Sequence, residues 1–148
     1  MRKVILIVAL TLGMISNVTA QGKLSIRCSF DSGNAADFVG SDIKQKRLSK
    51  GDLPPLTFDQ INARENSARL ITSTGTNDVF VSTGRVGSVH LLENTGYGNM
   101  NITTVFNISQ ITFTNSVAAV HSRHNASPQG SSTNPIPSQY YGSCVALP

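Results

Sequence analysis

The stretch LSIRCSF, residues 24–30, decides the fold class because its side chains alternate between apolar and polar. The residues of one parity are Leu24, Ile26, Cys28 and Phe30. A two-residue period of this kind indicates a β-strand with one buried face. Near the other end, QYYGSCVAL (residues 139–147) has the composition of a second strand and carries a second cysteine.

Cys28 and Cys144 are the only cysteines among the 148 residues. In an oxidising compartment a single pair usually forms a disulfide. Two isolated cysteines this far apart do not make a zinc site. We therefore predict that a Cys28–Cys144 bond joins the first strand to the last, with free thiols as the alternative.

Between these ends, short runs rich in Val, Ile, Phe and Thr recur among Gly, Asn, Ser and Pro, as in successive strands. The runs are PLTFDQIN (55–62), SARLITST (67–74), DVFVST (78–83), SVHLLENT (88–95), NITTVFNIS (101–109), ITFT (111–114) and VAAVHSR (117–123). The polar segment 31–52 fits either a short helix or an edge hairpin. Mostly short links favour antiparallel pairing. We predict an all-β fold: a single small antiparallel β-barrel or β-sandwich whose terminal strands are joined by the disulfide.

Residues 1–20 predict a secretory signal peptide. Arg2 and Lys3 precede an apolar run, which ends in a small-residue cleavage pattern at Ala20. The run is shorter than the roughly 20 residues that cross a bilayer. We expect residues 21–148 to form a single β-rich domain that is periplasmic or secreted, with no membrane insertion.

The charge of the chain excludes some partners. The formal net charge is +4, and removal of Arg2 and Lys3 leaves ten cations against eight anions, a net +2. This is too small to argue for nucleic acid. A local basic run comprises Lys44, Lys46, Arg47 and Lys50. Such runs are usually solvated faces, and the functional interpretation is a contact with acidic partners.

Arg123 is the main candidate for ligand binding, because it is the only Lys or Arg after Arg85. An arginine at a strand end can hold a carboxylate in a bidentate pair. One possibility is a structural salt bridge to Glu93 or Asp78. The other is a pocket that holds a small anionic ligand. The candidate binding residues are His121, Arg123, His124, Tyr140 and Glu93.

The histidines and tyrosines have directions that strand geometry predicts. His121 and His124 are three residues apart, so on a strand they point to opposite faces and do not form a natural metal pair. His90 is the third histidine. Tyr140 shares a parity with the second cysteine and is expected inside, whereas Tyr141 is expected on an outer surface.

No HExxH or GxSxG motif is present. We therefore predict no catalytic residue, no metal and no cofactor. An enzyme or metal-binding protein that uses His121, Arg123 and His124 is the alternative.

Two segments of the chain resemble a known set of proteins. The segment AVHSRH (119–124), followed by PSQYYGSC (137–144), resembles the ending of small exported proteins of Proteobacteria that carry an SRH…SQYYGxC pattern. ARLITSTGTNDVFV (68–81) and LLENTGYGNMNITTVF (91–106) look like the central strands of the same set. The resemblance implies a bacterial periplasmic or secreted setting and supplies no mechanism.

These observations give three functional hypotheses. The first is an exported β-domain that binds a small molecule or a protein partner. The second is the enzyme or metal-binding protein described above. The third is an inhibitor of an envelope protein, although a mildly basic domain is poorly matched to a basic target such as lysozyme.

Overall fold

The computed structural model describes residues 23–39, 41–95, 99–126 and 135–148, and the predicted signal peptide lies outside these ranges. Nine strands and two short 3-10 turns make up the fold. They are β1 (Leu24–Val39), β2 (Asp42–Ser49), β3 (Leu56–Asn62), β4 (Ser67–Thr72), β5 (Gly75–Thr83), η1 (Arg85–Gly87), β6 (Val89–Asn94), β7 (Met100–Val105), η2 (Ile108–Gln110), β8 (Val117–Ala126) and β9 (Pro135–Ala146).

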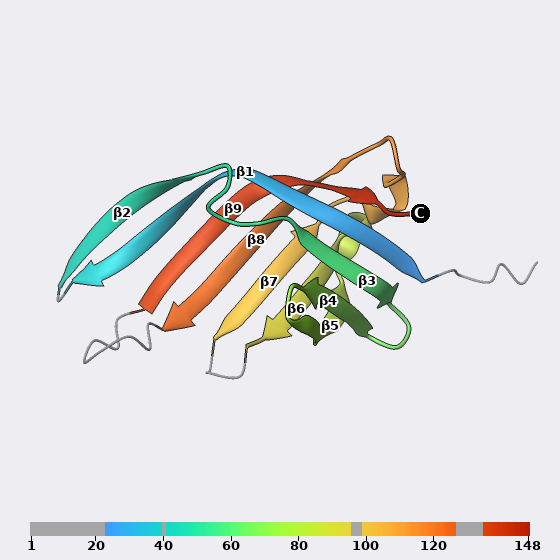
Figure 1. The fold of residues 1–148 in the computed structure, drawn as a ribbon, viewed down its shortest axis with the longest axis horizontal. Helices are drawn as coiled ribbons and strands as arrows, with labels where there is room; N and C mark the ends of the chain where they lie inside the picture. Colours follow the sequence, from blue (N-terminus) through green and yellow to red (C-terminus); the bar gives the residue numbers. More distant parts are fainter. Residues whose placement is uncertain (1–22, 40, 96–98, 127–134) are drawn as a thin grey trace, which may run out of the picture.

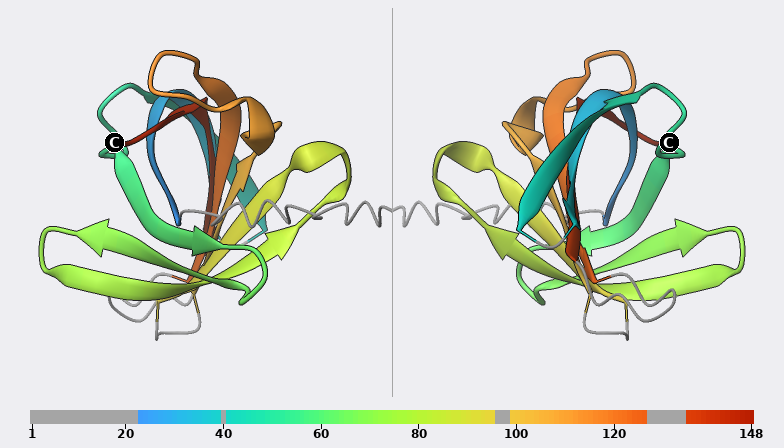
Figure 2. Two further views of the ribbon diagram at one scale, coloured as in Figure 1. Left: turned by 90° about the vertical axis from the view of Figure 1, so that its right-hand side faces the viewer. Right: turned by 90° about the vertical axis from the view of Figure 1, so that its left-hand side faces the viewer.

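Eight of the strands close into an antiparallel barrel (Figures 1 and 2). From β3 to β9 each strand pairs with the next along the chain, β1 pairs with β3, and β9 pairs back to β1. The prediction of an all-β fold is confirmed, and of the two predicted shapes the structure is the barrel. Closure satisfies the backbone of all eight strands and leaves the ring without an edge.

The long strand β1 belongs both to the barrel and to a hairpin that extends beyond it. Residues 24–28 pair with β3, whereas residues 32–39 pair with β2. The pairing of β1 with β9 shifts register between Phe30 and Ser32, and bulges of this kind bend a strand. The segment 31–52 is therefore mainly a β-hairpin, one of its two predicted forms, and it projects from one end of the barrel (Figure 1).

The inward side chains fill the barrel. The largest fully buried residues include Ile26, Phe58, Val79, Val81, Leu91 and Val105. An eight-stranded barrel has an interior just wide enough for side chains to fill. A ligand site is therefore expected at an end of this barrel and not along its axis.

The disulfide seals the barrel at the pairing of its first and last strands. Cys28 and Cys144 are directly opposite each other in β1 and β9, are fully buried and are bonded. The predicted terminal link is therefore confirmed, and it fits an extracellular or periplasmic protein. In the part of the chain that the structure describes, no helix is long and apolar enough to cross a membrane.

One predicted strand, NITTVFNIS (101–109), ends earlier than expected and another, ITFT, is absent, because local turn chemistry competes with the sheet. The strand that begins near Met100 ends at Val105, and Asn107 then adopts a left-handed φ of 52°. ITFT (111–114) is a loop, in which the Thr112 hydroxyl accepts the backbone N–H of Asn115 at 2.9 Å. Thr and Asn side chains that bond nearby backbone groups favour turns over strands.

Candidate functional site

A row of residues crosses the inner face of the sheet at the end from which the β1–β2 hairpin projects. We call it the inner row. Its members are successive register partners from β6 to β2: Glu93, Asn101, Arg123, Ser138, Ala35 and Lys46. Side chains alternate along a strand, and Arg123 follows the buried His121 by two residues, so it lies on the inner side.

Glu93 is a buried carboxylate, only 8% exposed, whose two oxygens are both satisfied by amides. Asn77 Nδ2 donates to Oε1 and Asn101 Nδ2 donates to Oε2, each at 2.8 Å. A buried charge needs such partners. Sequence reasoning missed both asparagines, because Asn77 stands in a Gly-Thr-Asn-Asp segment typical of turns and Asn101 in a strand with no other sign of function.

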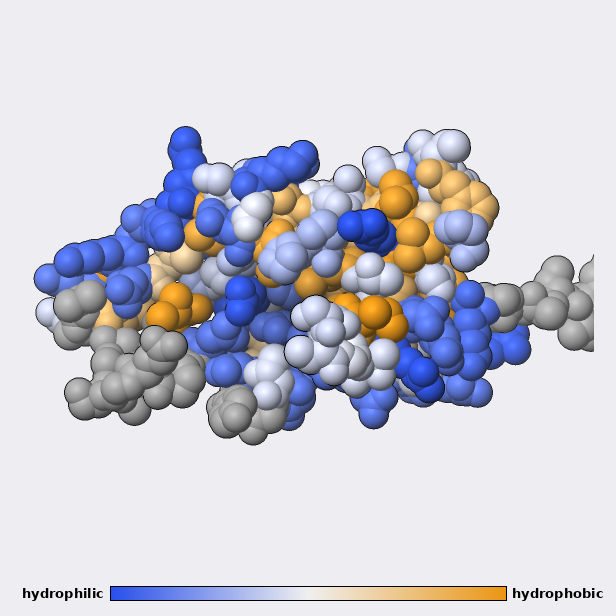
Figure 3. Space-filling model, in the orientation of Figure 1, coloured by the Kyte–Doolittle hydropathy of each residue, from blue (hydrophilic) through white to orange (hydrophobic). Residues whose placement is uncertain are grey.

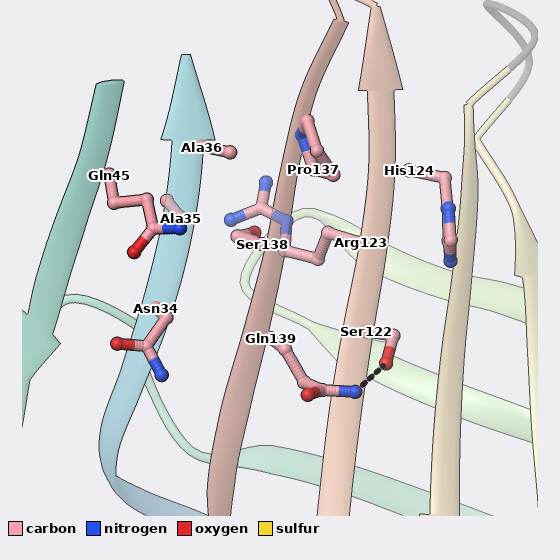
Figure 4. Close-up of a pocket in the computed structure, with 10 residues that line it drawn as sticks. All are labelled: Asn34, Ala35, Ala36, Gln45, Ser122, Arg123, His124, Pro137, Ser138 and Gln139. Carbon is pink, nitrogen blue, oxygen red and sulfur yellow. Dashed lines mark hydrogen bonds between the residues drawn. The ribbon is translucent and has the colours of Figure 1, made fainter. Parts of the chain in front are cut away.

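Arg123 does not form the predicted salt bridge. Within the described ranges, the one ion pair is between Lys50 and Asp31, so no carboxylate oxygen lies within 4 Å of the Arg123 guanidinium. Figure 4 shows the Arg123 side chain extending from β8 across β9 towards β1, beside Ser138. Arg123 is therefore a cation without an anionic partner among the residues described.

A buried layer of side chains lies next to the inner row. His121, 3% exposed, shares a hydrogen bond of 2.8 Å between its Nδ1 and the Thr103 hydroxyl. Its ring centroid is 5.7 Å from that of Phe30 and 6.1 Å from that of Tyr140. Tyr140 is buried and Tyr141 is exposed, as predicted from their parities.

Burial lowers the pKa of His121 from its ordinary value of 6.5 to about 4, with a further contribution from the nearby Arg123 cation and an opposing one from the Glu93 carboxylate. The imidazole is therefore neutral at pH 7.

The candidate residues do not all come together. The structure gathers Glu93, His121, Arg123 and Tyr140 on the inner side, whereas His124 is exposed and leans towards β7, away from Arg123 (Figure 4). His90 shares a hydrogen bond with Thr104 at 3.0 Å. Across the described ranges, no three His, Cys, Asp or Glu side chains are grouped so that they could hold a metal ion.

Thr103 and His121 are residue types that can act as a nucleophile and its general base, but they lack the surroundings that catalysis requires. Thr103 is 1% exposed, so both groups are enclosed in the barrel. The Glu93 carboxylate is bonded to two asparagines and not to the imidazole. A catalytic pair needs substrate access and an orienting third group, so this pair has a structural role.

A shallow hollow of about 500 Å³ lies over the part of the sheet where β8, β9 and the hairpin run side by side. Arg123, Ser138 and Ala35 of the inner row are among the residues that line it. The other lining residues have the opposite parity on their strands and so belong to the outer face of the sheet: Asn34, Ala36, Gln45, Ser122, His124, Pro137 and Gln139. Gln139 forms part of its wall: its Nε2 donates to the Ser122 hydroxyl at 3.2 Å (Figure 4), and its Oε1 accepts from Tyr141 at 2.7 Å.

Comparison of the chain with protein-family models, with curated proteins and with solved structures finds no match.

Proposed function

We propose that this is an exported binding protein that holds a small ligand with a carboxylate or phosphate group at the inner row. The observation that carries the proposal is the guanidinium of Arg123, which lies on the inner side of the barrel end without a carboxylate partner among the described residues. Arginine binds planar anions with two parallel hydrogen bonds, and an arginine without an anionic partner is suited to that role.

The neighbours of Arg123 leave room for such a ligand. Two small residues, Ser138 and Ala35, separate it from Lys46 along the inner row. Adjacent strands lie about 4.8 Å apart, so the backbones of Arg123 and Lys46 are about 14 Å apart. Long cationic side chains at both ends of this interval attract one anion between them.

A second unsatisfied group is next to Arg123. Asn101 Oδ1 is buried and has no hydrogen-bond partner among the residues that the structure describes. Buried acceptors are normally satisfied, so a ligand that carries a hydroxyl or an N–H beside its acidic group gains a further contact here. Export is supported by the disulfide and by the signal-peptide pattern of residues 1–20.

The test is isothermal titration calorimetry of the disulfide-bonded domain with succinate, malate and inorganic phosphate. We expect binding of at least one of them, with malate tighter than succinate because of its added hydroxyl. Arg123→Gln is expected to weaken binding about tenfold or more, since a charge-assisted hydrogen bond contributes roughly 1.5–3 kcal/mol.

Arg27→Gln is the matched control, because Arg27 is an exposed arginine on β1 with the same charge. It is expected to bind as the wild type does. Absence of binding for all three anions, or equal affinity in the Arg123→Gln variant, would contradict the proposal.

A further inference from the structure

Strand β2 has one unpaired edge, unlike the eight strands of the barrel. It is hydrogen-bonded to β1, and no other strand in the described part of the chain pairs with it. Residues 42–47 are all exposed, and the hairpin projects beyond the barrel (Figure 1). An open edge presents unpaired backbone N–H and C=O groups that can add another strand.

The side chains of this edge are mostly cationic, with Asp37 of β1 as the register partner of Lys44. Lys44, Lys46 and Arg47 are exposed, and none of them has a carboxylate within 4 Å in the described ranges. Asp42 is the one acidic residue of the strand. Figure 3 shows hydrophilic side chains gathered at this end of the molecule, over β2.

The positive charges of β2 disfavour pairing with a second copy of this chain and favour pairing with an acidic strand. Pairing with β2 of a second copy would bring lysine and arginine side chains close to one another, and like charges across a strand pair are destabilising. Lysines on an edge protect a protein against such self-association. A strand that carries Asp or Glu faces no such penalty.

We propose that the β2 edge binds an extended acidic segment of a partner protein as an added strand. Alternation places Lys44 and Lys46 on one face of β2 and Arg47 on the other. The partner segment therefore carries carboxylates at alternate positions opposite the two lysines, while backbone hydrogen bonds supply the pairing. This interaction shares Lys46 with the ligand site proposed at the inner row, but it does not use Arg123.

The test is fluorescence anisotropy of a labelled peptide that alternates glutamate and threonine over seven residues. We expect saturable binding to the wild-type domain. A peptide of the same sequence with every backbone nitrogen methylated keeps its charge but loses its N–H donors, and it is expected not to bind. Equal binding of the two peptides would overturn the proposal, as would binding of neither.

Protein variants separate this site from the inner row. The double substitution Lys44→Gln/Arg47→Gln is expected to weaken peptide binding at least fivefold, whereas the charge-matched Arg64→Gln/Arg85→Gln, outside the hairpin, is expected to leave it unchanged. Arg123→Gln is also expected to bind the peptide normally. Equal effects of the two double substitutions would show general charge attraction and would contradict strand addition at β2.

Discussion

The side chain of His121 couples the stability of the barrel to pH. Folding lowers its pKa from 6.5 to about 4 because burial disfavours the imidazolium. The unfolded chain therefore binds a proton over a pH range in which the barrel does not. By linkage, the free energy of unfolding falls as the pH decreases from about 6.5 to about 4.

We predict a loss of about 3 kcal/mol across this range, since one pKa unit corresponds to about 1.4 kcal/mol. Urea unfolding at pH 7, 5 and 4 measures it. His121→Gln should flatten the dependence, whereas His90→Gln should keep it. An unchanged slope in the His121→Gln variant would show that another group is responsible. Asp59 lowers the free energy of unfolding only at lower pH, because the hydrogen bond from Ser25 lowers the pKa of its carboxyl below 3.8.

For single residues, the sequence predicted which face of a strand a side chain occupies, but not which residues it contacts. The three-residue spacing of His121 and His124 correctly predicted opposite faces. The partner of Glu93 could not be predicted, because its two asparagines come from β5 and β7 and only the closed sheet brings them together. Glu93 was one of the two carboxylates considered for a salt bridge with Arg123, but these two asparagines occupy its oxygens instead.

The pairing of β1 with β9 closes the barrel, and it depends on one glycine of β9, Gly142. Gly142 is directly opposite Phe30. A Cβ at Gly142 would collide with the Ser29 carbonyl oxygen and with Phe30 Cα, both backbone atoms of β1. Backbone atoms in a ladder cannot move aside as a flexible side chain can, so the two strands would have to separate.

Gly142→Ala is therefore expected to lower the free energy of unfolding by at least about 2 kcal/mol, at the level of overpacked cores. Urea unfolding of the oxidised protein measures the loss. Ser143→Ala, at the next position of β9, adds no Cβ because serine already has one, and it should change stability by less than about 0.5 kcal/mol. Similar values for the two variants would argue against a tight β1–β9 seam.

Apolar–polar alternation and turn-forming residues predicted most strands, because both patterns depend only on residues that are neighbours in the sequence. The exceptions were segments in which a single side chain redirects the backbone, as Thr112 does in the loop before β8. The length of β1 was also missed. Its second half, SGNAADFV (residues 32–39), is weakly apolar and is held by pairing with β2 and β9.

The disulfide acts on the molecule as a whole because it joins residues 116 positions apart. In the chain-entropy model, a loop of this length stabilises the folded state by about 4–5 kcal/mol. Replacement of Cys28 and Cys144 by alanine should therefore lower the midpoint of urea unfolding strongly while the far-ultraviolet circular dichroism keeps its β signature. An unchanged midpoint would mean that the bond adds nothing to the barrel.

The all-β class and the terminal link could be predicted because they follow from periodicity and cysteine placement. Closure as a barrel could not, since the same strand runs also suit a sandwich. An edge hairpin in segment 31–52 was one of two predicted forms, and the structure selects it because β1 pairs with β3 in its first half and with β2 in its second. The resemblance to exported proteins of Proteobacteria stays a prediction.

Binding of an anion at the inner row can be mapped by chemical shifts of the 15N-labelled domain titrated with malate. Binding at the inner row predicts saturable shifts centred on Arg123, Ser138 and Ala35, with little change at Arg27. Shifts confined to the basic hairpin residues, or no saturable shift at Arg123, would contradict it.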